Sequence, residues 1–204
     1  MPELGLKTQI AHLKKDRKLK AVIEKVGPLR MNQTSDVYLS LMKAIVSQQL
    51  SVKAADTIWN RFLELFKDGY PNQQKLLKLS DEKLRSVGLS YQKAGYLKNI
   101  AKFSIDETLE HGALIQLNDD ELVDYLIQIK GVGRWTVEML MMFSLNRLDV
   151  LPKDDLGIQN GMINLYGIKA TGKRELYAEM EKVAERWKPY RSLACRYIWR
   201  FKNL

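Results

Sequence analysis

The chain has 204 residues, of which 46% are hydrophobic and 28% are charged, so it can fold as a globular protein with a sizeable core. Its 33 Lys and Arg residues exceed its 24 Asp and Glu residues by nine, and this surplus favours a polyanionic partner such as nucleic acid. The single cysteine, Cys195, excludes an internal disulfide and any four-cysteine zinc or iron–sulfur site. The sequence contains neither a signal-peptide core nor a run of about 18 apolar residues, which predicts an intracellular protein of the cytoplasm, nucleoid or nucleus without a membrane span.

The apolar residues recur mostly at helical spacing, and no alternating pattern persists long enough to indicate a sheet. Ser51, Ser90 and Asn118 precede helical patterns and are residue types that cap helix N-termini. The sequence therefore predicts an all-α protein. In chain order, the expected helices cover residues 10–25, 37–48, 52–66, 80–88, 91–103, 122–128, 134–144, 156–165, 174–186 and 190–202.

A Gly-x-Gly turn separates two of these expected helices. Gly131 and Gly133 permit a tight reversal of the chain, and the helix that begins at Arg134 presents backbone N–H groups and the positive end of its dipole. With Lys130 and Arg134 adding positive charge, the turn can bind a DNA phosphate without reading sequence. Taken alone, the same pattern is equally typical of a plain turn between two helices.

Four segments, in this order along the chain, resemble the helix-hairpin-helix superfamily of DNA glycosylases, and the first and last resemble its DNA-3-methyladenine glycosylase branch. The resemblance extends from about residue 35 to the end of the chain. It implies a two-lobed, all-α fold with the active-site cleft between the lobes, in the compact form without an N-terminal sheet domain. The four segments are Ala44–Ala55, Leu126–Thr136, Leu151–Ile158 and Glu185–Ser192.

The lobes expected from this resemblance divide a single domain that spans residues 1–204. Residues 36–145 form the central lobe, with the hairpin at 126–138. Residues 1–35 and 146–204 form the other lobe, because the two ends of a helical chain usually need to pack together.

The resemblance implies that Asp155 is the catalytic carboxylate. Such a group stabilises the oxocarbenium character that develops at the sugar, and it can orient or deprotonate the attacking water. The neighbouring Asp154 is expected to cap the helix or organise the backbone, and N-capping is also the alternative function for Asp155. Superfamily members that cut the DNA strand carry a lysine at the position of Trp135, and tryptophan cannot act as an amine nucleophile. The reaction is therefore expected to stop at an abasic site.

Trp135, Trp199 and Met139 occupy positions that resemble walls of the base pocket in this superfamily. An alkylated purine carries positive charge, which a tryptophan face attracts by roughly 0.5–2 kcal/mol. Ordinary core packing is the alternative for both tryptophans, whereas Trp187 is expected to be structural. Some relatives carry an aromatic residue in place of Met139, so the range of lesions is left open.

The resemblance also implies a DNA interface. Gln49 stands where relatives fill the gap that a flipped base leaves in the duplex. No organic cofactor is implied, although the hairpin carbonyls are expected to hold a Na⁺ or K⁺ ion. His12 and His111 have no partners at metal-ligand spacing and are expected to be solvated. The expected DNA-binding residues are Gln49, Lys130, Gly131, Gly133, Arg134 and Thr136.

These observations predict a monofunctional DNA glycosylase that acts as a monomer on duplex DNA and excises alkylated purines such as 3-methyladenine and 7-methylguanine. Two alternatives are open. The chain could be a non-catalytic helix-hairpin-helix module that recognises damaged DNA. It could also be a glycosylase for another lesion, such as hypoxanthine.

Overall fold

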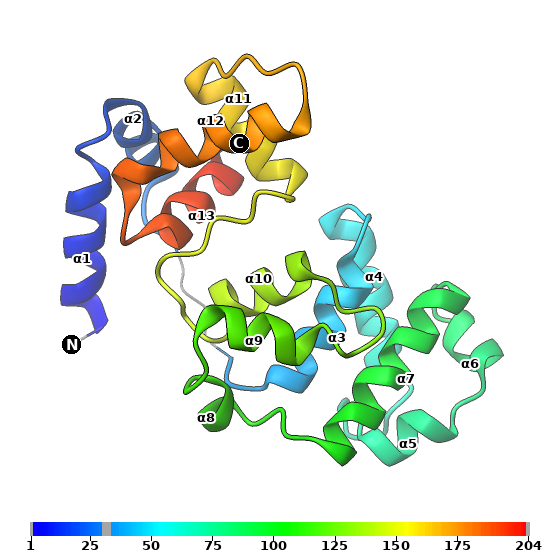
Figure 1. Cartoon of the computed structure of the whole chain (residues 1–204). Helices are drawn as coiled ribbons and strands as arrows, with labels where there is room; N and C mark the ends of the chain where they lie inside the picture. The colour runs from blue at the N-terminus through cyan, green and yellow to red at the C-terminus, as the bar shows by residue number, and fades with distance from the viewer. Residues whose placement is uncertain (1, 30–33, 203–204) are drawn as a thin grey trace. The chain divides into compact units, whose positions relative to one another are not determined.

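A computed structural model describes residues 2–29 and 34–202 (Figure 1). Within these residues the regular structure is entirely helical, which confirms the all-α prediction. The chain divides into a central unit, Gln33–Leu145, and a terminal unit, Met1–Asn32 with Asn146–Leu204. The boundaries predicted from the sequence are 35/36 and 145/146, and residues 30–33 lie outside the described residues.

The terminal unit joins the two ends of the chain, because α2 packs directly against α13 (Figure 1). The segment over residues 10–25, where the sequence predicts one or two helices, belongs to two helices. Asp16 interrupts it and caps α2, accepting hydrogen bonds from the backbone N–H groups of Lys18 and Leu19. The helices are α1 (Pro2–Leu13), α2 (Arg17–Val26), α11 (Leu156–Tyr166), α12 (Lys173–Ala184), η1 (Glu185–Trp187) and α13 (Arg191–Lys202).

One buried carboxylate ties three elements of the terminal unit together. The Oδ2 atom of Asp16 accepts hydrogen bonds from the Tyr166 hydroxyl at 2.9 Å and from the Trp187 indole N–H at 3.2 Å. Burial, together with the nearby charge of Asp16, raises the pKa of Tyr166. Trp187 and Cys195 are both fully buried, as expected of structural residues.

The central unit is built around α3 and α7, which pack against each other and against most of their neighbours. Two short helices, α5 and α8, were not predicted because four to six residues carry too little periodic pattern. The helices are α3 (Val37–Ser47), α4 (Val52–Leu63), α5 (Gln73–Lys78), α6 (Asp81–Arg85), α7 (Tyr91–Asp106), α8 (His111–Leu114), α9 (Asp119–Leu126) and α10 (Arg134–Phe143).

The predicted N-caps in the central unit are confirmed. Ser51 and Ser90 each accept a hydrogen bond from the backbone N–H three residues later. Asn118 forms a capping box with Glu121, so both ends of the box satisfy backbone donors. These caps explain why the predicted starts of α4 and α7 agree with the structure, whereas the ends of helices differ by up to three residues.

The prediction that the two histidines are solvated is wrong. The half-buried ring of His12 packs edge-to-face on Tyr190, with ring centroids 5.3 Å apart. His111 Nε2 lies 3.3 Å from the carbonyl oxygen of Ser144. Among the described residues, no group of three or more His, Cys, Asp or Glu side chains could hold a metal ion. None of the helices described is both long and apolar enough to cross a membrane.

Candidate active site and nucleic-acid interface

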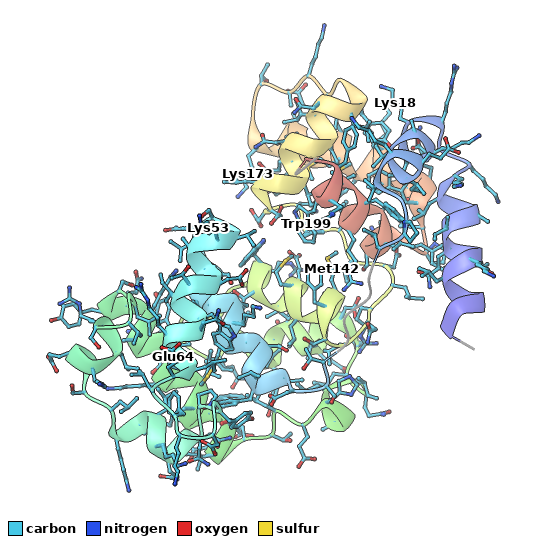
Figure 2. The ribbon with its side chains drawn as sticks, turned by 180° about the vertical axis from the view of Figure 1, so that it is seen from behind. Lys18, Lys53, Glu64, Met142, Lys173 and Trp199 are labelled. Carbon is cyan, nitrogen blue, oxygen red and sulfur yellow. The ribbon has the colours of Figure 1, made fainter. Side chains whose placement is uncertain are left out.

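Asp155 and Trp199 come together in the terminal unit, although 44 residues separate them in the chain. Asp155 caps α11, and its Oδ1 atom accepts a hydrogen bond from the backbone N–H of Ile158 at 2.8 Å. The same oxygen accepts a hydrogen bond from the indole N–H of Trp199 at 2.7 Å. Figure 2 labels Trp199, which lies on α13. Two donors on one oxygen fix the orientation of the carboxylate. Asp155 is therefore an N-cap, but one whose side chain is also held by an aromatic residue.

Gly157 leaves the space that this pair occupies. A Cβ atom on Gly157 would lie 2.8 Å from Trp199 Nε1 and 2.9 Å from Asp155 Oδ1, closer than real carbon contacts allow. One turn later, a Cβ atom on Gly161 would overlap with the side chain of Ile198. Two glycines thus let α11 approach α13 closely. Neither glycine was singled out from the sequence, although their four-residue spacing places both on one face of a helix.

Asp154 is not a cap of α11, which corrects the expectation for this residue. Its side chain is 45% exposed and forms an ion pair with Lys173, with 2.8 Å between Nζ and Oδ1. It also accepts a hydrogen bond from the Tyr177 hydroxyl. The hydrogen bonds from Lys173 and Tyr177 hold the pKa of Asp154 below its ordinary value. The two adjacent carboxylates therefore have different partners, one on α12 and one on α13.

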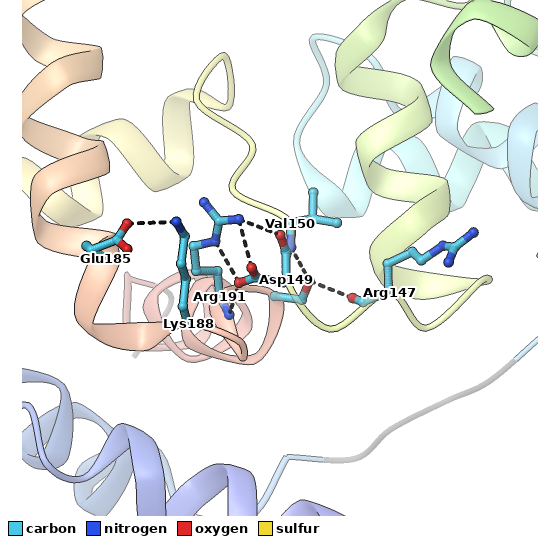
Figure 3. A network of polar contacts seen from close by, with 7 residues as sticks. Arg147, Asp149, Val150, Glu185, Lys188 and Arg191 are labelled. Atoms are coloured by element: carbon cyan, nitrogen blue, oxygen red, sulfur yellow. Dashed lines mark hydrogen bonds and ion pairs between the residues drawn. The ribbon is translucent and has the colours of Figure 1, made fainter. Parts of the chain in front are cut away.

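The loop that leads to Asp155 is clamped to the start of α13 (Figure 3). Arg191 makes a two-pronged contact with Asp149, in which Nε lies 2.6 Å from Oδ1 and Nη2 lies 2.9 Å from Oδ2. Beside it, the Ser192 hydroxyl donates to the carbonyl of Arg147 and accepts from the backbone N–H of Val150. These contacts fix the backbone five residues before Asp155. They also account for the Arg-Ser pair that ends the Glu185–Ser192 motif.

The hairpin of the central unit has the predicted geometry. Gly131 has a φ angle of 106°, which glycine adopts readily, and the backbone N–H of Val132 closes the turn on the carbonyl of Ile129. Gly133 precedes α10 and has no side chain to cap its first turn. Lys130 and Arg134 are both exposed, and Arg134 lies 3.4 Å from Glu138. A helix N-terminus without a side-chain cap, flanked by two exposed cations, suits a phosphate.

The remaining predicted residues on α10 have different environments. Trp135 is half-buried and Met139 is buried, and their spacing of four residues places them on one face of the helix. Thr136 was expected to contact DNA, but its side chain is only 1% exposed and its hydroxyl accepts a hydrogen bond from the Gln48 side chain. The expectation for the Thr136 side chain is therefore corrected. As the third residue of α10, it faces the core of the unit.

Gln49 occupies the turn between α3 and α4. Its side chain is exposed, and its φ angle of 58° is left-handed, a region that residues other than glycine adopt infrequently. The neighbouring Gln48 is tied to α10 through Thr136, at 3.2 Å. The turn therefore presents Gln49 outward from a backbone conformation that its neighbours hold in place.

A protein-family model described as the HhH-GPD superfamily of base excision DNA repair proteins matches residues 42–188. The chain belongs to this superfamily. It is 38% identical over 196 residues to DNA-3-methyladenine glycosylase 1 of Schizosaccharomyces pombe, and the alignment covers 93% of this chain and 84% of that protein.

Solved structures agree with this assignment. The structure of the S. pombe 3-methyladenine DNA glycosylase in complex with abasic DNA matches with a TM-score of 0.87 and 36% identity, covering 97% of both chains. A DNA-3-methyladenine glycosidase from Bacillus halodurans matches with a TM-score of 0.73 and 35% identity, covering 92% of this chain and 85% of the other. These matches confirm the helix-hairpin-helix glycosylase fold that the sequence motifs predicted.

Proposed function

We propose that the protein is a monofunctional DNA glycosylase of base excision repair that removes alkylated purines, such as 3-methyladenine and 7-methylguanine, from duplex DNA. One observation supports this most strongly: the carboxylate of Asp155 is fixed by the indole N–H of Trp199 at 2.7 Å. The name of the S. pombe relative, a DNA-3-methyladenine glycosylase, supports the choice of lesion.

Asp155 is the catalytic residue in this proposal. Cleavage of the N-glycosidic bond leaves positive charge on the sugar, and a carboxylate already held in position stabilises that charge without reorganisation. An alkylated purine is cationic and leaves readily as a neutral base, so the reaction needs no strong general acid. Asp155 also orients the water that attacks the sugar.

The tryptophans and Met139 are assigned to recognition of the base. The indole faces of Trp135 and Trp199 attract the cationic purine, and Met139, one turn after Trp135, adds an adaptable apolar contact. Because position 135 is tryptophan and not lysine, the enzyme forms no Schiff base. The product is an intact strand with an abasic site.

The central unit is assigned to the DNA backbone and the duplex. The hairpin, with Lys130, Gly131, Gly133 and Arg134, binds a phosphate, and Gln49 fills the gap left by the flipped base. Carbonyl oxygens of the turn are ligands of the kind that Na⁺ or K⁺ takes, and two of them, on Ile129 and Lys130, already accept hydrogen bonds from Val132 N–H and Asn99. A cation held there would strengthen the attraction of the phosphate. We propose that the enzyme acts inside the cell, as a monomer.

Base release from a duplex that carries one 7-methylguanine tests the proposal. We expect single-turnover release of the free base and an abasic site that breaks only on treatment with alkali. Strand cleavage without alkali would contradict the monofunctional assignment. Tight binding to a duplex that stays intact would favour the non-catalytic module.

A competition experiment tests the choice of lesion. Duplexes with 7-methylguanine and with hypoxanthine are offered together at equal concentration, and we expect preferential release of the methylated base. Equal or faster release of hypoxanthine would overturn the alkylpurine assignment while leaving the glycosylase reaction intact.

Size-exclusion chromatography tests the oligomeric state. Elution of the DNA-free protein at the size of a dimer would contradict the proposal that the enzyme is a monomer.

A further inference from the structure

Three side chains on one face of α7 reach the two turns that the proposed function assigns to DNA. Lys93, Tyr96 and Asn99 recur every three residues, so they lie on the same face of the helix. Lys93 contacts the turn that carries Gln49, while Tyr96 and Asn99 contact the hairpin. We call these three residues the α7 support face. None of them was singled out from the sequence.

Lys93 holds the end of α3, just before Gln49. Its Nζ atom donates to the carbonyl oxygens of Val46, at 2.8 Å, and of Gln48, at 2.7 Å. Carbonyls at a helix C-terminus lack intrahelical donors, and a cation there also complements the negative end of the helix dipole. Burial lowers the pKa of Lys93. Its ammonium group therefore bridges the last turn of α3 and the residue next to Gln49.

The hairpin is held by the other two residues of the support face. Asn99 Nδ2 donates to the carbonyl oxygen of Lys130 at 3.0 Å. The ring of Tyr96 packs so closely against Gly131 that a Cβ atom there would overlap with it. The Tyr96 hydroxyl accepts a hydrogen bond from Gln92, one turn earlier, which fixes the ring. Gly131 is thus required both for its positive φ angle and for the space that Tyr96 fills.

We propose that the α7 support face fixes the spacing between the hairpin and the Gln49 turn, and that Lys93 is a positioning residue for Gln49. This inference rests on the proposed function, in which the hairpin grips the backbone and Gln49 fills the duplex. Lys93 and Asn99 both bond to backbone carbonyls, so they set the shape of each turn and leave its outward side chain available. Both residues lie on the same 16-residue helix, so α7 is a common support for the two turns. If one of these contacts changes, the turn that it holds moves relative to the other turn.

A double-mutant cycle between Lys93→Met and Gln49→Ala tests the role of Lys93. Methionine keeps most of the apolar stem and removes the ammonium. Lys93→Met is expected to slow single-turnover excision about tenfold, because it removes two hydrogen bonds from a charged donor. In the Gln49→Ala background the same change should cost less than about twofold, because the positioned side chain is already absent. Lys98→Met is the matched control, since Lys98 lies on the same helix and pairs with Asp81 on α6.

DNA affinity separates positioning from a direct phosphate contact. Lys93→Met should bind a duplex with an abasic-site analogue about as tightly as Lys98→Met does, whereas Asn99→Leu should weaken binding by loosening the hairpin. Equal losses of excision and affinity in Lys93→Met, or additive losses in the cycle, would overturn the proposal. Lys93→Arg retains the hydrogen-bond donors, so its excision rate should be close to that of wild type. If Lys93→Met melts below the assay temperature, Lys93→Arg replaces it in the comparison. In that case, an Arg variant as slow as Gln49→Ala would overturn the proposal.

The failure of this inference is distinguishable from failure of the proposed function. A 2-aminopurine placed opposite the abasic-site analogue reports how the gap is filled, and this readout does not require base release. If wild type fails to release any methylated base, the proposed function fails, and the fluorescence difference between wild type and Lys93→Met still tests the positioning role. If wild type is active and the fluorescence is unchanged by Lys93→Met, only the positioning role is overturned.

Discussion

The terminal and central units hold the residues of the proposed site in opposite ways. In the terminal unit the supporting hydrogen bond is made to the functional side chain itself, from the Trp199 indole to Asp155 Oδ1 at 2.7 Å. In the central unit the supports are made to backbone carbonyls, from Lys93 to Gln48 and from Asn99 to Lys130. A carboxylate that stabilises charge needs a fixed orientation. A turn that contacts DNA needs a fixed shape and outward side chains, so the structure fits the demands of each role.

Gly157→Ala is the substitution expected to break the terminal-unit arrangement most severely. The new methyl group meets both Trp199 Nε1 and Asp155 Oδ1, so one of them must move. A displacement of about 1 Å at a reacting group can cost on the order of a hundredfold in rate. Single-turnover base release measures this loss. Gly172→Ala is the control, because a Cβ atom there meets nothing within 4 Å, and equal rates for the two variants would contradict the close-approach argument.

Arg191→Ala tests the clamp on the loop that leads to Asp155. It removes a two-pronged contact with Asp149 that is about three-quarters buried, so unfolding in urea should become easier by about 2 kcal/mol. Arg191→Lys should recover less than half of this, since an ammonium group cannot reproduce the planar fork. Arg200→Ala, an exposed position on the same helix, serves as the control. A loss no larger than that of Arg200→Ala would mean that the clamp contributes nothing to stability.

Trp199→Phe sharpens the comparison by removing the indole N–H while keeping an aromatic ring. Loss of one hydrogen bond to a charged group predicts about a tenfold slower excision at unchanged affinity for abasic DNA. Trp187→Phe is the contrasting variant: Trp187 is fully buried and donates to Asp16, so its loss should lower the melting temperature and spare the rate of the folded enzyme. The opposite pattern would reassign Trp199 to core packing.

Asp154→Asn should have the smallest effect. Lys173 and Tyr177 lower the pKa of Asp154 in the folded state. The ion pair therefore stabilises the fold at pH values above the ordinary pKa of an aspartate, and this stabilisation is lost as the pH falls through the lowered pKa. Because both side chains of the pair are largely exposed, solvent screens their attraction and the stabilisation is small. Urea titrations at neutral and strongly acidic pH should show a difference between wild type and Asp154→Asn only at neutral pH.

The sequence allowed prediction of features that a short motif specifies. Gly131 and Gly133 predicted the hairpin, and the serine caps predicted the starts of α4 and α7. Contacts between residues far apart in the sequence were not predictable. No local pattern distinguishes Lys93 from the other lysines on helices, or Gly157 from other helical glycines. Thr136 shows the reverse error: it belongs to the hairpin motif in sequence, yet its position in the first turn of α10 faces it inward. A residue can belong to a DNA-binding motif in sequence and still have a buried side chain.

The most direct test of the account compares Asp155→Asn with Asp154→Asn in single-turnover release of 7-methylguanine. Asparagine retains the helix cap at position 155, and Asp154 does not cap α11, so both variants should fold and bind DNA. We expect Asp155→Asn to lose at least about a hundredfold in rate, because the charge facing the developing cation is gone. Asp154→Asn should stay close to wild type. Full activity in Asp155→Asn, or a larger loss in Asp154→Asn, would contradict the assignment of Asp155 as the catalytic carboxylate.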